Sequence, residues 1–304
     1  MESSILSFPT RGQGGSAGWR GNFAPQLVEE LISEYHPALV RDPMMGSGTT
    51  PDVCKRLGVP CWANDLKDGF DALTGEWKLG GNLTILHPPY AFAIPYSGSV
   101  WGQKPDPRDP STWPPERYPA FIAWLNEITF HAYETMEPGG ILAILTADVR
   151  KAGRLYPIPF DLARYGELVA NLVKIQHNVR SAGTQYSSRN FIPIMHEVLM
   201  LTRKPRLFAF IIEGAQTRAF QFDLRQFIKA SWPALVLAGM HEADDKTDLQ
   251  TLYQVMSGYA RVKLAQAQGI DWQAIVRRIL QEQDCFASVE RGVWQVNKPA
   301  IRVQ

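Results

Sequence analysis

The stretch Asp42-Pro-Met-Met-Gly-Ser-Gly-Thr-Thr50 decides the expected fold, because it joins a short apolar run to a helical pattern. The apolar run is Ala38–Val40, and residues 49–58 have the composition of a helix that ends at Gly58. A strand, a glycine-rich turn and a helix in this order are typical of a parallel sheet. Glycines in such a turn let the backbone approach a ligand, and the helix start offers free N–H groups.

The same alternation of strands and helices continues on both sides of this turn. The spacing of the apolar residues predicts helices over 23–36, 119–136 and 160–174, and strands over 59–63, 83–86, 141–145 and 191–202. We therefore expect an α/β fold with a mostly parallel, doubly wound sheet. The proline-rich residues 91–118 predict a long irregular loop, and a loop of that length inside a compact domain is usually functional.

The bulk properties set limits on the class of protein. The chain has 304 residues, 45% of them hydrophobic, and a formal net charge of +1, so no global basic signal for nucleic acid is present. Three cysteines at unrelated spacings predict neither a disulfide framework nor a metal site. The N-terminus lacks a signal-peptide pattern, and no apolar run reaches the roughly 18 residues needed to span a membrane, so a cytoplasmic protein without a membrane partner is expected.

The sequence predicts two domains. Residues 1–205 carry the strand–helix alternation, residues 206–227 are expected to form a linker, and residues 228–304 are mostly helical. Within the last segment, Trp272–Gln281 reads as a helix and 286–296 as two short strands about a glycine turn.

Three ligands are compatible with the glycine-rich loop in principle. A phosphate loop would need a lysine after the last glycine, and a dinucleotide loop would need a third glycine, and neither is present. The third option is the methionine carboxylate and ribose of S-adenosylmethionine. Asp65, at the end of the next expected strand, favours this option because its carboxylate can accept hydrogen bonds from a ribose diol. Asp71 and Ala72 follow closely and could meet the adenine.

A second motif, His87-Pro-Pro-Tyr90, follows the strand 83–86. An aromatic amino group is a poor nucleophile, and a site can activate it by accepting both of its N–H hydrogens. A neutral His87 ring supplies a side-chain acceptor, the prolines fix a backbone carbonyl, and Tyr90 offers a flat face to a base. A base that undergoes chemistry must leave the duplex stack, so such a platform is expected.

The ordered motifs resemble amino-group DNA methyltransferases. The resemblance covers roughly residues 5–204: an Arg20-Gly-Asn-Phe23 segment, the glycine-rich loop, Asp65 and His87-Pro-Pro-Tyr90 occur in that order. It implies a Rossmann-like class I methyltransferase fold with a closing antiparallel hairpin, S-adenosylmethionine as cofactor and double-stranded DNA as partner. The residues that would hold the cofactor are Gly21, Asn22, Phe23, Asp42, Pro43, Met44, Gly46, Ser47, Gly48, Thr49, Thr50, Asp65, Asp71 and Ala72.

The resemblance also assigns the reaction. The catalytic residues would be His87, Pro88, Pro89 and Tyr90, with adenine-N6 favoured as the target and cytosine-N4 as the alternative. In that family the first motif position is usually Asp, Asn or Ser. An unperturbed histidine has a pKa of about 6.5, so we expect protonation of His87 to limit activity in acid.

The C-terminal segment resembles a winged helix-turn-helix, which would make Trp272–Gln281 the recognition helix. Several arginines and a lysine on the expected DNA-facing elements are then candidate contacts to DNA. They are Arg108, Lys151, Arg154, Arg180, Arg189, Arg277, Arg278 and Arg291.

Two alternatives remain open. Methyl transfer to RNA or to a protein glutamine uses related Pro-Pro-Tyr sites, and a DNA-binding regulator could keep the fold without catalysis. The sequence indicates no metal, and it leaves the oligomeric state, monomer or homodimer, and a cognate restriction nuclease undecided.

Overall fold

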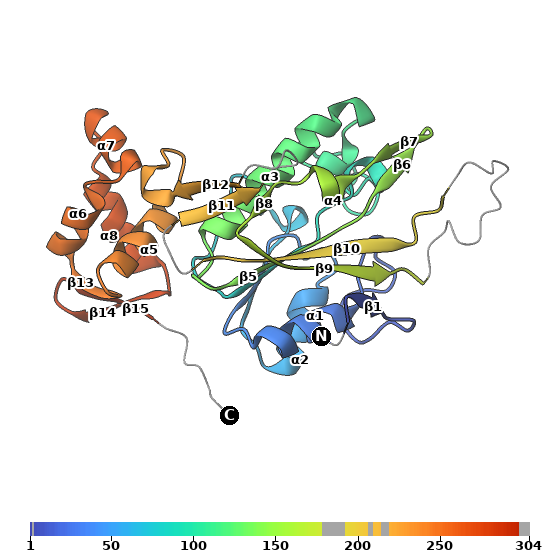
Figure 1. Ribbon diagram of the computed structural model, residues 1–304, viewed down its shortest axis with the longest axis horizontal. Helices are drawn as coiled ribbons and strands as arrows, with labels where there is room; N and C mark the ends of the chain where they lie inside the picture. Colours follow the sequence, from blue (N-terminus) through green and yellow to red (C-terminus); the bar gives the residue numbers. More distant parts are fainter. Residues whose placement is uncertain (2, 178–191, 206–208, 214–218, 298–304) are drawn as a thin grey trace.

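A computed structural model provides the structure of the chain, and it describes residues 1, 3–177, 192–205, 209–213 and 219–297. Its centre is a seven-stranded sheet with the order β1-β9-β10-β5-β4-β2-β3 (Figure 1). The strands are β1 (Ile5–Ser7), β2 (Val40–Asp42), β3 (Cys61–Ala63), β4 (Leu83–Leu86), β5 (Ile141–Thr146), β9 (Glu167–Ile175) and β10 (His196–Arg203).

The directions of these strands confirm the expected fold class. Strands β2, β3, β4 and β5 are parallel to one another, and β10 is antiparallel to both of its neighbours, β5 and β9. Strand β1 extends the sheet beside β9 in parallel register. The result is the predicted Rossmann-like methyltransferase sheet, mostly parallel and closed by the antiparallel hairpin β9–β10.

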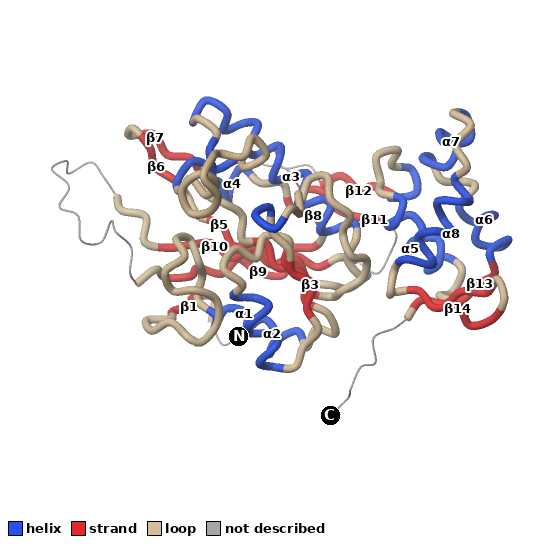
Figure 2. Tube along the Cα trace, turned by 180° about the vertical axis from the view of Figure 1, so that it is seen from behind, coloured by secondary structure: helices blue, strands red, loops and turns tan. Residues whose placement is uncertain are grey.

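Helices cover both faces of the sheet (Figures 1 and 2). Helices α1 (Pro25–Tyr35) and α2 (Thr49–Leu57) cover one face, and α3 (Tyr118–Glu134) covers the other. Every residue of β5 is buried, because alternate side chains point into one or the other apolar cluster. The predicted helices over 23–36, 49–58 and 119–136 are therefore confirmed.

The helix predicted over 160–174 is wrong. A short helix, α4 (Ile158–Asp161), is followed by β8 (Arg164–Tyr165) and then by β9. The decisive pattern lies toward the end of β9, where buried Leu172 and Lys174 alternate with exposed neighbours, as they do in a half-buried strand. Ladder pairing with β10 along the whole of β9 satisfies the backbone there, and the sequence alone does not show that partner.

The irregular loop expected over residues 91–118 is confirmed, and only three short 3-10 turns interrupt it: η2 (Ala91–Ala93), η3 (Pro110–Thr112) and η4 (Pro115–Arg117). Buried Asp109 holds the loop together by accepting hydrogen bonds from the backbone N–H groups of Ser97, at 2.7 Å, and Ser111, at 2.9 Å. The loop is therefore a packed structure. Beside it, β6 (Val149–Lys151) and β7 (Arg154–Tyr156) form a small hairpin.

The segment expected to be a linker contains a β-hairpin, β11 (Ala209–Glu213) with β12 (Ala219–Asp223), which extends β8. A mainly helical segment follows. Its order is α5 (Trp232–Glu242), β13 (Lys246–Asp248), α6 (Leu249–Met256), α7 (Ala260–Ala267), α8 (Trp272–Glu282), β14 (Phe286–Glu290) and β15 (Val293–Val296). Strand β13 lies between α5 and α6 in the chain, and it forms a three-stranded sheet of order β13-β15-β14 with the two strands that follow α8.

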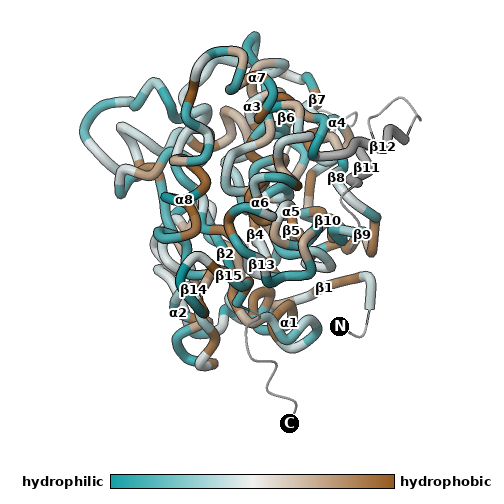
Figure 3. The backbone as a smooth tube through the Cα atoms, turned by 90° about the vertical axis from the view of Figure 1, so that its left-hand side faces the viewer, coloured by the Kyte–Doolittle hydropathy of each residue, from teal (hydrophilic) through white to brown (hydrophobic). Residues whose placement is uncertain are grey.

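The C-terminal segment packs at the edge of the sheet where β4 and β5 begin. Lys78, five residues before β4, pairs with Asp284 at 2.5 Å, and Glu134, before β5, accepts a hydrogen bond from the Ser231 backbone. One apolar cluster runs from α3 into α5 and α8. Figures 1 and 2 show this segment at one end of the long axis, and Figure 3 views the molecule from that end. Among the described residues, no helix has the length and apolarity that crossing a bilayer requires.

Candidate functional site

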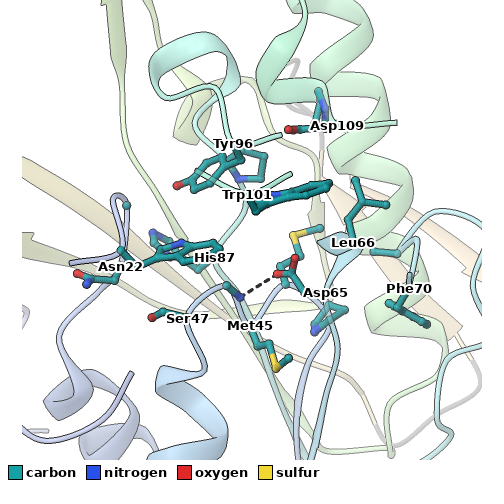
Figure 4. A pocket seen from close by; sticks show the side chains of 18 of the residues that line it. Asn22, Met45, Ser47, Asp65, Leu66, Phe70, His87, Tyr96, Trp101 and Asp109 are labelled. Carbon is teal, nitrogen blue, oxygen red and sulfur yellow. Dashed lines mark hydrogen bonds between the residues drawn. The ribbon is translucent and has the colours of Figure 1, made fainter. Parts of the chain in front are cut away.

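Two cavities meet at the opposite edge, where the parallel strands end, and Figure 4 shows the first of them. This edge is where open α/β sheets bind ligands. The first, the loop cavity, is lined by the glycine-rich turn and the 3-10 turn after β3. The second, the strand-end cavity, has a volume of about 460 Å³ and is lined by the ends of β4, β9 and β10. Four residues line both: Gly21, Asn22, His87 and Tyr96.

Most of the residues predicted to hold a cofactor come together in the loop cavity. They are Gly21, Asn22, Phe23, Pro43, Met44, Gly46, Ser47, Thr49, Asp65, Asp71 and Ala72. Asp42, Gly48 and Thr50 do not line it. Gly48 has a φ of +86° and caps the start of α2, a left-handed conformation that glycine adopts without strain.

Asp42 is buried beneath the glycine-rich turn and holds its shape. Its Oδ1 accepts the Met44 N–H at 3.0 Å, and its Oδ2 accepts the Thr50 hydroxyl at 2.6 Å. Burial raises the pKa of this carboxyl to about 7, although both hydrogen bonds act in the opposite direction. Asp42 therefore supports the turn from below.

Asp65 follows strand β3, and its carboxylate links the end of β3 to the glycine-rich turn. Its Oδ2 accepts the Gly46 N–H at 2.8 Å, the dashed contact in Figure 4, and its Oδ1 accepts the Lys67 N–H at 3.0 Å. Each carboxylate oxygen keeps a second lone pair, and the side chain lines the loop cavity. Asp65 can thus accept hydrogen bonds from a diol while it fixes the turn.

Gly21 lies where no side chain fits. Its φ is +79°, and a Cβ built on it would lie 1.9 Å from the hydroxyl of Tyr96. Phe23, two residues later, meets the His87 ring edge to face with a centroid distance of 5.0 Å. The predicted Gly-Asn-Phe segment thus lies directly against the His87 motif.

His87 lies at the junction of the cavities. Burial lowers the pKa of its ring to about 4, and the nearby Glu197 carboxylate only partly offsets this. The expectation of an ordinary histidine pKa near 6.5 is therefore wrong, because the strand end encloses the ring. At neutral pH His87 is uncharged and can accept a hydrogen bond.

Two residues that the sequence analysis did not single out complete the motif. Glu197 at the start of β10 accepts the Tyr90 hydroxyl at 2.7 Å and the Lys174 ammonium at 2.5 Å. Burial alone would raise the pKa of Glu197, but Lys174 and the hydrogen bonds bring it below its usual value. The strand register places Glu197 directly opposite Lys174 in the β9–β10 hairpin. A correct prediction of a strand over 167–175 would have suggested this contact.

The long loop over residues 91–118 covers one side of the loop cavity. Tyr96 and Trp101 lie above the turn in Figure 4, and Asp109 and Pro110 also line the cavity. Arg108, predicted to contact DNA, lies at this cavity and pairs with Asp106 at 2.7 Å. Other lining residues were not predicted as cofactor contacts: Met45, which lies within the glycine-rich turn, and Trp19, Leu66, Phe70 and Trp124, which lie outside the quoted motifs.

The remaining residues predicted to contact DNA lie in two parts of the described structure or outside it. Lys151 and Arg154 are exposed on the β6–β7 hairpin, where Lys151 lies 5.3 Å from the centre of the Phe92 ring. Arg277, Arg278 and Arg291 are exposed on the C-terminal segment, at the sheet edge opposite His87. Arg180 and Arg189 lie outside the described residues. In the part of the chain that the structure describes, no three His, Cys, Asp or Glu side chains gather as metal ligands.

Comparison with known proteins adds a distant likeness. No family model and no curated protein matches the chain. Among solved structures, TrmN from Thermus thermophilus is similar, with 16% identity and a TM-score of 0.33. The match covers 62% of this chain and 51% of that one, so the chain spans about half the length of that protein.

Proposed function

We propose that this protein is an S-adenosylmethionine-dependent methyltransferase that acts on the exocyclic amino group of a nucleic-acid base. One observation carries the proposal: an uncharged His87 lies where a cavity built from a glycine-rich turn meets a cavity built from Pro88 and Tyr90. A methyl donor in the first cavity and an amino group in the second would meet at this residue. Holding two reactants in this way supplies much of the rate in a transfer reaction.

The loop cavity fits the cofactor by its shape and its donor set. Asp65 offers lone pairs to a ribose diol, and the turn from Pro43 to Ser47 brings its backbone to the cavity wall. Gly21, which tolerates no Cβ, lets the chain pass closely between the two cavities. When bound, S-adenosylmethionine would supply an electrophilic methyl group.

The strand-end cavity fits the amino group that receives the methyl. His87 accepts one N–H hydrogen, and the Pro88 carbonyl, which no backbone N–H of the described residues engages, accepts the other. Hydrogen bonds to both N–H hydrogens draw them out of the plane of the base, so that the nitrogen lone pair points toward the methyl donor. The Tyr90 ring supports a base that has left its stack.

Duplex DNA is the substrate that we propose, with adenine-N6 favoured and cytosine-N4 as the alternative. The C-terminal segment supports this choice, because its helices and its small three-stranded sheet resemble a winged helix, and such folds commonly place a helix in the major groove. That segment lies at the far edge of the sheet, so it would grip the duplex away from the flipped base. The exposed Lys151 and Arg154 beside the catalytic edge would make the nearer contacts to phosphate.

Expression in a host that lacks DNA methylation tests the proposal, followed by sequencing that detects modified bases. We expect methylated adenines in a fixed sequence context with the wild-type chain and none with His87→Ala. A matched surface change, Arg56→Ala on α2, should leave the pattern unchanged. Transfer of labelled methyl groups to RNA or to protein, with none to DNA, would overturn the choice of substrate. Tight DNA binding without any transfer would identify a regulator instead.

A further inference from the structure

The Tyr90 hydroxyl is the middle of a chain of side chains that runs from the closing hairpin to His87. At one end, Lys174 Nζ lies 2.5 Å from Glu197 Oε2. The Tyr90 hydroxyl donates to Glu197 Oε1 at 2.7 Å, and His87 Nε2 lies 2.9 Å from the Tyr90 oxygen. Lys174 and Glu197 are both buried, and both line the strand-end cavity.

The charges along this chain fix the direction of every hydrogen bond in it. Glu197 faces the Lys174 ammonium, so it is a carboxylate and can only accept. The single hydroxyl hydrogen of Tyr90 must therefore point to Glu197. The Tyr90 oxygen can then only accept from His87, so the hydrogen of the uncharged ring is on Nε2.

The other ring nitrogen, Nδ1, is left with a free lone pair. Among the described residues, no group forms a hydrogen bond with His87 Nδ1, and the ring lines both cavities. We propose that Lys174, Glu197 and Tyr90 are positioning residues that hold His87 as the Nε2–H tautomer, so that Nδ1 accepts a hydrogen from the substrate amino group. The role given to Nδ1 rests on the proposed function, whereas the tautomer does not.

The need to select one tautomer explains why a buried ion pair, Lys174 with Glu197, lies beside His87, at a motif position that is usually Asp, Asn or Ser in the family that the sequence resembles. An aspartate can only accept, but a histidine accepts at one nitrogen and donates at the other, and the two tautomers interchange unless a neighbour selects one. A carboxylate at Glu197 makes the selection because it cannot donate to Tyr90. Lys174, its cross-strand partner, keeps that carboxylate ionised.

Nuclear magnetic resonance of the whole chain labelled with ¹⁵N-histidine tests the tautomer without a substrate. Long-range proton–nitrogen correlations distinguish the two ring forms, and the His87→Asn variant assigns the signal. At pH 7 we expect the hydrogen on Nε2. A signal from the Nδ1–H form would overturn the proposal.

A matched pair of double variants tests the chain itself. In Lys174→Met with Glu197→Leu, the Tyr90 hydroxyl loses its acceptor and turns to His87 Nε2, so the hydrogen should move to Nδ1. In Lys174→Met with Glu197→Gln, the amide can accept from Tyr90 through its oxygen or donate to it through its nitrogen, so a substantial share of the Nε2–H form should be retained. We expect kcat to fall about 100-fold or more in the first variant and only a few-fold in the second. KM for S-adenosylmethionine should be unchanged in both.

Two outcomes separate the two proposals, and a further variant covers a failure to fold. If both double variants keep the Nε2–H form, Lys174 and Glu197 do not select the tautomer and the inference fails. If the tautomer moves as expected and wild type transfers no methyl group to any substrate, the proposed function fails while the tautomer selection stands. Where the leucine variant does not fold, Tyr90→Phe replaces it: loss of the hydroxyl should give a mixture of tautomers, and a single Nε2–H form would overturn the inference.

Discussion

At the scale of single residues, His87 stands where the resemblance implies Asp, Asn or Ser, and its surroundings compensate for the difference. A histidine acceptor would fail in mild acid if its pKa were ordinary. Enclosure between Phe23 and Tyr90 lowers the pKa of His87 to about 4, which keeps the ring neutral. Burial thus lets His87 accept a hydrogen bond in mild acid, as an ionised aspartate at this position would.

This lowered pKa predicts the pH dependence of methyl transfer. Below pH 4 His87 becomes a cation and can no longer accept, whereas above that value it stays neutral, so we expect no rate loss from His87 between pH 8 and about pH 5. Single-turnover rates across this range, beside an NMR titration of His87, measure the effect. An acid limb centred near pH 6.5 that disappears in His87→Asn would contradict it.

Gly21 yields a second prediction at this scale. Gly21→Ala places a methyl group 1.9 Å from the Tyr96 hydroxyl at a positive φ, so the chain must shift where the two cavities join. We expect about tenfold weaker binding of S-adenosylmethionine, since the strained conformation alone costs about 1 kcal/mol. Calorimetric titration measures it, and adding Tyr96→Phe should restore part of the loss. Equal affinity in wild type and Gly21→Ala would contradict the prediction.

At the scale of secondary structure, patterns that depend on near neighbours were predictable and those that depend on distant partners were not. The strand Leu83–Leu86 has the predicted bounds, and α2 ends at Leu57 with the predicted Gly58 as its cap, because an apolar run and a C-terminal glycine signal them locally. Strand β9 was mistaken for a helix, because its pairing with β10 crosses some twenty residues of chain. Because the pairing of β9 with β10 was not predicted, the ion pair between Lys174 and Glu197 was not predicted either.

Arg41 shows how the elements are tied together and gives a prediction on stability. This fully buried side chain on β2 donates to Thr84 on β4 and to the carbonyls of Lys78, Ala132 and Thr135. Arg41→Met leaves these acceptors unpaired, so we expect a loss of about 3 kcal/mol or more in the free energy of unfolding. Urea unfolding measures it. The surface change Arg56→Met should cost at most about 1 kcal/mol, and a similar small loss at Arg41 would refute the assignment.

At the scale of the whole molecule, the two ends of the sheet carry different features. Both cavities lie where the parallel strands end, and the opposite end carries the C-terminal segment, whose helices share an apolar cluster with α3. A domain that shares its core is not removed without exposing apolar surface. Truncation after residue 205 should therefore lower stability as well as any DNA affinity, which makes it a poor test of recognition.

Point changes on α8 test recognition in the intact chain. Arg277 and Arg278 are exposed, and their nearest acids, Asp271 and Glu282, lie at 3.9 Å, so charge reversal should leave the fold intact. If α8 grips duplex phosphates, Arg277→Glu with Arg278→Glu should weaken DNA binding at least tenfold and flatten its salt dependence. Affinity for S-adenosylmethionine should be unchanged, because the loop cavity lies beyond the opposite ends of the strands.

The matched reversal Arg56→Glu on α2 controls for net charge. Unaltered DNA affinity in the double variant would leave the β6–β7 hairpin and the long loop to hold the duplex, and the C-terminal segment would then act by supporting the core that it shares.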